Sequence, residues 1–170
     1  MGELADKVIK AGQIGLDTSP FIYYFEKNPA YLNICREIFD LFEAGKTSAI
    51  TSVVTLLEVL VQPLAQQRHD LVHTYTESLT TLPHLFLCQI DKEIAVKAAE
   101  LRAAYKLKTA DAIQISAAIL WDAQLFLTND PIFRRVKEIE VVILDDILKN
   151  VEDNLEKKAD SGSEEQNSAG

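Results

Sequence analysis

Short apolar runs alternate with longer segments of helical period along most of this 170-residue chain. Such runs are typical of buried strands, and they are bounded by polar or small residues. Parallel strands need long crossover connections, which helices usually supply, so the alternation predicts an α/β fold with a central parallel sheet. The expected strands cover residues 13–17, 48–51, 85–90, 125–128 and 141–144.

The segments between the expected strands carry helix start and stop signals. Pro20 lies in the first turn of the helix that follows the first strand. Ser52 is expected to cap the helix after the second strand, and Pro63 to end it. Asp91 is expected to cap the helix after the third strand. The expected helices cover 19–27, 31–43, 53–62, 65–79, 92–105 and a stretch that starts at Thr109 or Asp111 and ends near Asp122.

The length of the chain and its hydrophobic fraction of 48% indicate one globular domain. We expect this domain to span residues 12–149, between a polar N-terminal extension at 1–11 and an acidic, disordered tail at 150–170. No apolar run approaches the roughly 20 residues that span a bilayer, and the N-terminus lacks the features of a signal peptide. Cys35 and Cys88 belong to no CxxC pair and are expected to be buried free thiols. These features predict a cytoplasmic protein without a membrane segment.

The net charge of −9 argues against binding nucleic acid through a broad basic face. Residues 151–170 contain six acids and two lysines, which leaves −5 for the rest of the chain. An acidic chain can still act on a nucleic acid, because metal ions at a carboxylate cluster supply local positive charge.

Four carboxylates stand in otherwise apolar segments. Asp17 ends the first expected strand, and Asp130 follows the fourth. Glu58 is the only charge between residues 53 and 61, and Asp111 begins a helix of apolar or small residues. A carboxylate in such a segment destabilises the fold unless its charge is compensated. Four of them suggest one shared compensator, for which a divalent metal is the natural candidate.

The expected topology brings these acids together. Ligands of open α/β sheets bind at the carboxyl ends of the strands, where the strand order reverses. Asp17 and Asp130 lie at such ends, and Glu58 and Asp111 lie on adjoining helices. If the strands of Asp17 and Asp130 are neighbours, all four side chains can converge on one cleft.

Each acid also has a purely structural explanation. Asp17 and Asp130 can cap the helices that follow them, and Asp111 can be a first-turn acid favoured by the helix dipole. Glu58 caps nothing, so its alternative is an ion pair with a lysine or an arginine. The position of all four acids at the same end of the sheet favours a shared site over four separate explanations.

The chemistry of these side chains indicates the metal and the reaction. Oxygen ligands suit Mg²⁺ or Mn²⁺, and the absence of histidine or cysteine near the four acids disfavours zinc. Such ions activate an attacking water and stabilise the charge that develops when a phosphoryl group is displaced. The predicted reaction is metal-assisted hydrolysis of phosphodiester bonds.

Four short motifs surround the acids. They are Leu16-Asp17-Thr18-Ser19, Thr55-Leu56-Leu57-Glu58, Thr109-Ala110-Asp111-Ala112 and Thr128-Asn129-Asp130. These motifs resemble the acidic motifs of PIN-domain ribonucleases, and the resemblance covers roughly residues 12–148. It is closest to the small bacterial VapC-like proteins that form the toxin half of toxin–antitoxin pairs.

The resemblance implies a three-layer α/β/α PIN-like fold with strand order 3-2-1-4-5. It also implies an endoribonuclease that cuts single-stranded RNA, a cognate antitoxin protein and a homodimer. Ser19 and Thr128 match polar positions near the metals and are candidate orienters. The implied catalytic residues and ligands of Mg²⁺ or Mn²⁺ are Asp17, Glu58, Asp111 and Asp130.

Three alternatives stay open. His69 and His73 are spaced like the histidines of a zinc-protease motif, with Asp70 in place of the glutamate base. Because aspartate is one methylene shorter, surface histidines on a polar helix explain this pattern better. The chain can also be a non-catalytic PIN binding module, or an RNA-processing nuclease outside a toxin system.

Other conspicuous side chains lie near the motifs. Tyr23 and Tyr24 follow the first motif and can stack on an RNA base, although their apolar neighbours suggest that one belongs to the core. Arg102, Lys106 and Lys108 precede the third motif, where they can contact phosphates or form a solvated basic surface.

Overall fold

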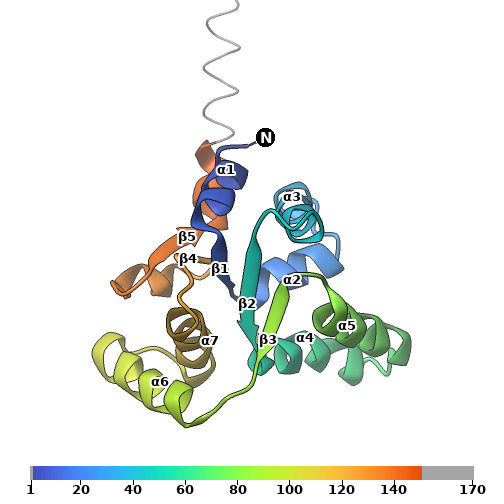
Figure 1. The fold of residues 1–170 in the computed structure, drawn as a ribbon. Helices are drawn as coiled ribbons and strands as arrows, with labels where there is room; N and C mark the ends of the chain where they lie inside the picture. Colours follow the sequence, from blue (N-terminus) through green and yellow to red (C-terminus); the bar gives the residue numbers. More distant parts are fainter. Residues whose placement is uncertain (1, 151–170) are drawn as a thin grey trace, which may run out of the picture.

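The computed structural model describes residues 2–150 of the chain. It contains one sheet of five parallel strands in the order β3-β2-β1-β4-β5 (Figure 1). The expected parallel sheet and its strand order are therefore confirmed. The strands are β1 (Gln13–Leu16), β2 (Ser48–Ser52), β3 (Leu85–Cys88), β4 (Leu125–Thr128) and β5 (Glu140–Ile143). The acidic tail that we expected at 150–170 lies almost wholly outside the described residues.

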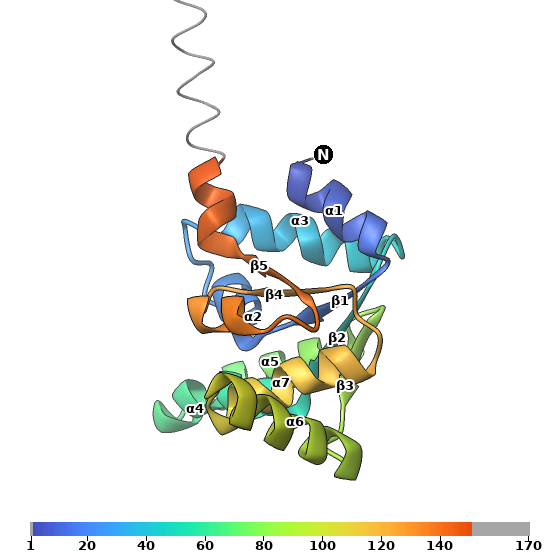
Figure 2. The same cartoon turned by 90° about the vertical axis from the view of Figure 1, so that its left-hand side faces the viewer.

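Helices cover both faces of the sheet, which gives three layers. Figure 2 shows α1 and α3 on one side of the strands and α6 and α7 on the other. No helix within residues 2–150 is long and apolar enough to cross a membrane. The helices are α1 (Glu3–Ala11), α2 (Thr18–Phe25), α3 (Leu32–Glu43), α4 (Val53–Ala65), α5 (His69–Thr81), α6 (Lys92–Tyr105), α7 (Thr109–Leu120) and the 3-10 helix η1 (Pro131–Arg135), and residues 144–150 are also helical.

The core consists of two apolar clusters, one on each face of the sheet. Leu16 and Leu127 of the central strands contribute to the cluster beneath α1, α2 and α3. Phe126, which directly precedes Leu127 in β4, contributes to the cluster beneath α6 and α7 on the opposite face. This alternation follows from the period of two in a strand, and it explains why the central strands are apolar on both faces.

Gly15 allows α7 to pack unusually close to β1. A Cβ atom at this position would lie 2.4 Å from the Cβ of Ala118 and 2.7 Å from a ring carbon of Phe126. Real Cβ atoms do not approach other carbons this closely, so any other residue would push α7 away from the strand. Gly15 therefore keeps the helix that begins near Asp111 against the strand that ends before Asp17.

Residues 3–11 form helix α1, whereas the sequence indicated only a polar extension and did not specify its structure. Leu4, Ala5 and Val8 of this helix are buried in the first apolar cluster. Their spacing of three and four residues is that of one helix face. This segment belongs to the packed fold.

Two expected helix boundaries are wrong. Pro63 does not end α4, which continues to Ala65. A proline in the last turn removes one backbone hydrogen bond, but the next bond, from the amide of Gln66 to the carbonyl of Gln62, is made at 3.0 Å. The chain turns instead at Gln67, which has a φ of 56°, so α5 begins at His69 and not at residue 65.

Candidate metal centre at the carboxyl ends of the central strands

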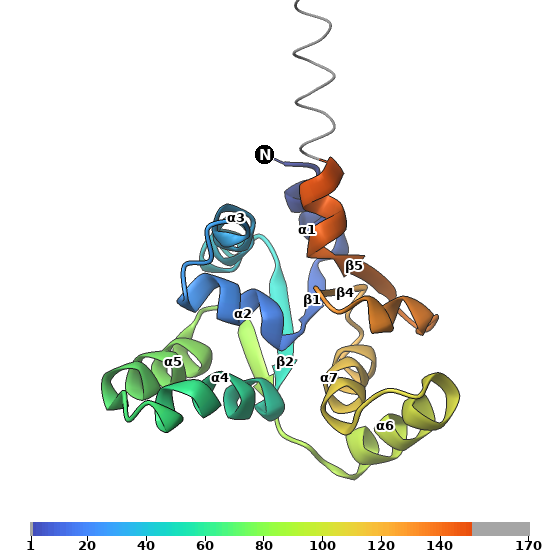
Figure 3. The same ribbon diagram turned by 180° about the vertical axis from the view of Figure 1, so that it is seen from behind.

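The four acids lie on the elements that the sequence predicted. Asp17 follows β1 and Asp130 follows β4, and these two strands are neighbours in the sheet. The backbone amide of Asp17 donates to the carbonyl of Leu127 at 3.0 Å, which fixes the two strand ends together. Glu58 lies in the middle of α4 and Asp111 in the first turn of α7. Figure 3 shows α2, α4 and α7 on this side of the molecule.

Asp17 is the most deeply buried of the four acids, with 9% of its surface exposed. Burial, together with the smaller effect of the charges of Glu58 and Asp111, raises the pKa of its carboxyl group from 3.8 to about 6. Hydrogen bonds from the Thr128 hydroxyl and the Thr18 amide oppose this rise only in part. Asp17 makes no side-chain hydrogen bond that caps α2, so the structural explanation for this residue does not hold.

Asp111 lies in a similar electrostatic environment. Burial raises the pKa of its carboxyl group, and the charge of Asp130 acts in the same direction. Lys108, one turn earlier, partly opposes the rise. Within residues 2–150, none of the four acids forms a salt bridge. The ion pair that we considered for Glu58 is therefore not made by the described residues.

Glu58 is held by two neutral donors. The Thr18 hydroxyl and the Gln114 amide both donate to Oε2 of Glu58, the latter at 2.9 Å. The other carboxylate oxygen, Oε1, has no hydrogen-bond partner among the described residues. One oxygen of Glu58 is thus anchored by the protein and the other is free to bind a ligand.

Asp130 and Thr128 lie side by side at the end of β4. Oδ1 of Asp130 accepts a hydrogen bond from the Ile132 amide at 2.9 Å, so this acid does cap η1. The Thr128 hydroxyl donates to Oδ2 of Asp17 at 2.5 Å and accepts from the Asp130 amide at 3.0 Å. Of the two candidate orienters, Thr128 therefore contacts an acid directly, whereas Ser19 accepts from the amide of Asn129 at 3.1 Å.

The charges of neighbouring acids raise the pKa values of Asp17 and Asp111, but the four side chains do not form a preassembled coordination site. Within the described part of the chain, no three acidic, histidine or cysteine side chains are placed to hold one ion as they stand. The donor set nevertheless suits a hard divalent cation, because it consists of carboxylate oxygens and no basic side chain within residues 2–150 forms a salt bridge with any of them. The raised pKa values of Asp17 and Asp111 identify charge that the fold leaves uncompensated.

Sequence reasoning missed two polar residues that support the site. Gln114 is 2% exposed and contacts both Thr18 and Glu58. Asn129 donates to Tyr23, Tyr31 and Asp145, and so connects the end of β4 to the segment after β5. The sequence signal that could have identified Gln114 is a polar residue in an otherwise apolar helix, one turn after Asp111.

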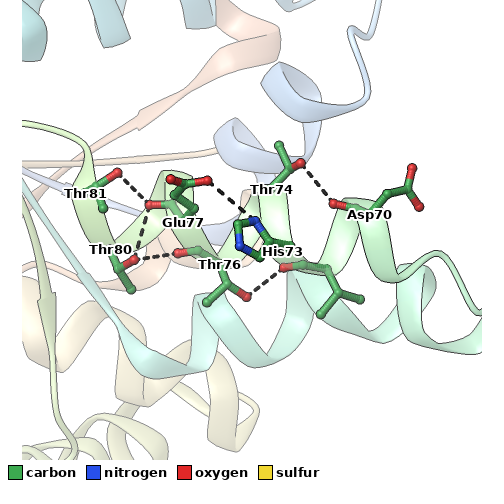
Figure 4. A network of polar contacts seen from close by, with 8 residues as sticks. Asp70, His73, Thr74, Thr76, Glu77, Thr80 and Thr81 are labelled. Carbon is green, nitrogen blue, oxygen red and sulfur yellow. Dashed lines mark hydrogen bonds and ion pairs between the residues drawn. The ribbon is translucent and has the colours of Figure 1, made fainter.

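The two histidines of α5 belong to no group of three metal-binding side chains within residues 2–150. The side chain of His73 is 80% exposed and lies 3.5 Å from Glu77, one turn further along the same helix. Figure 4 shows that the threonine hydroxyls around this pair donate to backbone carbonyls of α5. The arrangement is that of a solvated helix surface, as the sequence favoured.

The remaining candidates divide between core and surface. Tyr23 stacks on Tyr31 with ring centroids 4.1 Å apart, and Tyr24 packs on Phe39 at 4.5 Å. Both tyrosines lie against the first apolar cluster. Lys108 is exposed and forms no salt bridge with the described residues.

Comparisons with known proteins agree with this architecture. A model of the PIN domain family matches residues 14–139. The structure of VapBC2 from Rickettsia felis bound to a DNA fragment from its promoter aligns with a TM-score of 0.60 and 15% identity, over 77% of this chain and 98% of that chain. A toxin–antitoxin complex from Klebsiella pneumoniae aligns with a TM-score of 0.57 and 21% identity, over 76% and 95%. At these identities the structural matches show a shared fold. No curated protein gives a significant match.

Proposed function

This chain belongs to the PIN-domain family, and we propose that it is a divalent-metal-dependent endoribonuclease that hydrolyses phosphodiester bonds of single-stranded or loop RNA. The observation that carries this proposal is the buried carboxyl group of Asp17. Its pKa is raised to about 6 beside two further acids, and no described basic side chain forms a salt bridge with it. A site of this kind is suited to a cation and not to an anionic or neutral ligand.

Asp17, Glu58, Asp111 and Asp130 would hold the ion, which we expect to be Mg²⁺ or Mn²⁺. When bound, the ion would supply the Lewis acidity that activates a water molecule and offsets the charge on the phosphoryl group. The protein residues set the geometry of the site. Thr128 fixes one oxygen of Asp17, and the Ile132 amide fixes one oxygen of Asp130, so the two acids keep defined positions at the strand ends.

In the proposed reaction, a bond forms between the water oxygen and the phosphorus as the bond to the leaving ribose oxygen breaks. This route uses water and not the ribose hydroxyl as the nucleophile. It therefore predicts linear products, without a cyclic phosphate end.

We place this activity in the toxin of a toxin–antitoxin pair, with a cognate antitoxin protein as partner. The two solved structures that share the fold support this role, because both are described as toxin–antitoxin assemblies or VapBC complexes. An aromatic hollow of about 270 Å³ between α2, α3 and α5 offers a surface for such a partner.

Cleavage of cellular RNA would locate the protein in the cytoplasm. An RNA-processing role would use the same chemistry, but its gene would lack an antitoxin-like neighbour.

We also propose a homodimer, in keeping with the apolar surface of α4. Leu57, Val61 and Leu64 follow one another at helical spacing and are 64%, 59% and 52% exposed. Contiguous exposed apolar patches can mark protein–protein contact sites, and this stripe is the surface that we assign to the dimer.

Incubation of the purified protein with a pool of structured RNAs tests the proposed activity. We expect fragments with linear ends in Mn²⁺ or Mg²⁺ and intact RNA in EDTA. Intact RNA under both conditions, with the protein folded and the metal bound, would favour the non-catalytic binding module. Products that appear equally in EDTA would refute the metal-dependent mechanism.

A further inference from the structure

We propose that Gln114 is a positioning residue, which orients Glu58 so that one oxygen of its carboxylate stays free for the cation. The proposal rests on the metal site of the proposed function and adds a residue that is not itself a ligand. It is carried by the hydrogen bonds of a single buried amide.

Gln114 is almost completely buried, and from α7 it makes three polar contacts to residues of two other helices, α2 and α4. Its Nε2 atom donates to Oε2 of Glu58 on α4 at 2.9 Å and to Oγ1 of Thr18 on α2 at 2.8 Å. Its Oε1 atom accepts from the hydroxyl of Thr55 at 3.2 Å. Both amide hydrogens are used, so the side chain has one orientation. The flipped amide would point its oxygen at the carboxylate of Glu58, which accepts hydrogen bonds and cannot donate when ionised.

The two donors to Glu58 converge on the same oxygen. Gln114 and the Thr18 hydroxyl both donate to Oε2, and Thr18 in turn accepts from Gln114. Oε1 has no partner among the described residues. A carboxylate anchored through one oxygen keeps the other available in a fixed direction, which is the usual arrangement for a metal ligand and the residues that orient it.

The position of Gln114 on α7 links two of the acids. Residues three apart lie on the same face of a helix, so Gln114 and Asp111 face the same side of α7. One helix thereby supplies an acid of the site and the amide that orients a second acid from α4. A change at Gln114 should therefore alter the site without removing any ligand.

Titration calorimetry with Mn²⁺ tests this role in the full-length protein. Methionine has nearly the shape of glutamine but no donor, so Gln114→Met should weaken Mn²⁺ binding by about 10-fold to 100-fold, the usual effect of losing an orienting partner of a metal ligand. Ser116→Ala is the matched control. Ser116 is buried two residues further along α7 and its hydroxyl has no hydrogen-bond partner among residues 2–150, so its loss should leave the affinity unchanged. Thermal melts in EDTA establish that each variant is folded.

A double-mutant cycle separates positioning from a general effect on stability. In a Glu58→Gln background, Gln114→Met should cause no further loss of Mn²⁺ affinity, because the side chain that it orients is no longer a carboxylate. Gln114→Asn, which stays polar but is one methylene too short to reach Oε2, should behave like Gln114→Met and replaces it if that variant does not fold. Excess Mn²⁺ should restore RNA cleavage by the Gln114 variants with an unchanged KM.

The outcomes separate this inference from the function on which it rests. Wild-type protein that binds no Mn²⁺ would overturn the proposed function and the role of Gln114 with it. Wild-type binding that both Gln114 variants leave intact would overturn the role of Gln114 alone. An equal loss of affinity in Ser116→Ala would also overturn it, because the effect would then belong to the packing of α7.

Discussion

Replacement of Asp17 by asparagine should stabilise the protein in the absence of metal. The carboxyl group of Asp17 is buried, and its pKa is raised from 3.8 to about 6. At pH 7 this shift costs about 3 kcal/mol of folding free energy, because each pKa unit corresponds to about 1.4 kcal/mol. Asparagine removes the charge and retains an oxygen that can accept the hydrogen bond from Thr128. Some strength of that bond is lost with the charge, so we expect a net gain of about 1 to 2 kcal/mol.

The pH dependence gives this effect a distinctive signature. A carboxyl group whose folded pKa is raised stabilises the fold when it is protonated. That stability is fully present below pH 3.8 and is lost as the pH rises through 6. Metal-free wild-type protein should therefore become more stable as the pH falls from 7 toward 4, until other groups titrate. The Asp17→Asn variant should lack this component, so the difference between the two proteins should shrink over the same range.

Thermal melts in EDTA and in Mn²⁺ measure both effects. At pH 7 in EDTA, Asp17→Asn should melt about 2 to 8 °C above wild type, given about 2 to 4 °C per kcal/mol for a domain of this size. Mn²⁺ should reverse the order, because wild type gains about 2.7 kcal/mol at 100 times its dissociation constant and the variant loses a ligand. Asp40→Asn changes the same charge at an exposed position of α3 and should melt as wild type does. An Asp17→Asn protein that melts below wild type in EDTA would refute the reasoning, since Asp17 would then stabilise the fold.

Three further predictions concern the surface of the molecule. Val61→Glu, on the exposed stripe of α4, should convert a dimer to a monomer in light scattering. The control substitution Val96→Glu, at an exposed position of α6, should leave the dimer intact. A wild-type protein that is monomeric at micromolar concentration would contradict the proposed dimer. Lys108→Ala should raise the KM for RNA and flatten the salt dependence of binding by about 0.7 in log–log slope, the value for one phosphate contact on a single strand. Lys92→Ala, at the far end of α6, serves as its control. Equal effects of the two substitutions would show that Lys108 acts through the overall charge of the protein and not through a phosphate contact. Truncation after Glu156 should leave the melting temperature unchanged, because the residues removed contain no large apolar side chain, and a fall of several degrees would show that they pack on the domain.

The sheet could be predicted because its signal is local and repeated. Each strand is a short apolar run, and each crossover is long enough for a helix, so the parallel arrangement follows from the pattern alone. The strand order came from the resemblance of the motifs around the acids. The helix ends near residues 63–69 were not predictable in the same way. Pro63 is a strong stop signal in general, but its position in the last turn removed only one hydrogen bond, and the turn at Gln67 decided the boundary.

The acids of the candidate site were visible in the sequence, but their supporting contacts were not. Asp17 and Glu58 stand out because charge in an apolar segment is unfavourable. The amide of Gln114 is neutral, and only the crossing of α2, α4 and α7 shows that it contacts Thr18 and Glu58. Contacts between side chains that are 56 and 96 residues apart in the sequence depend on the packing of whole helices, which periodicity does not specify. For the same reason the burial of Val8 in α1 was missed.

Single-turnover cleavage of a susceptible RNA tests the central claim most directly. We predict that wild type and Asp40→Asn cleave the RNA in Mn²⁺ to products with linear ends, and that EDTA abolishes the reaction. Asp17→Asn should slow cleavage by at least about 100-fold, because the loss of a metal ligand removes several kcal/mol of stabilisation of the transition state. Cleavage that persists in excess EDTA, or at an undiminished rate in Asp17→Asn, would contradict a metal-dependent nuclease at this site.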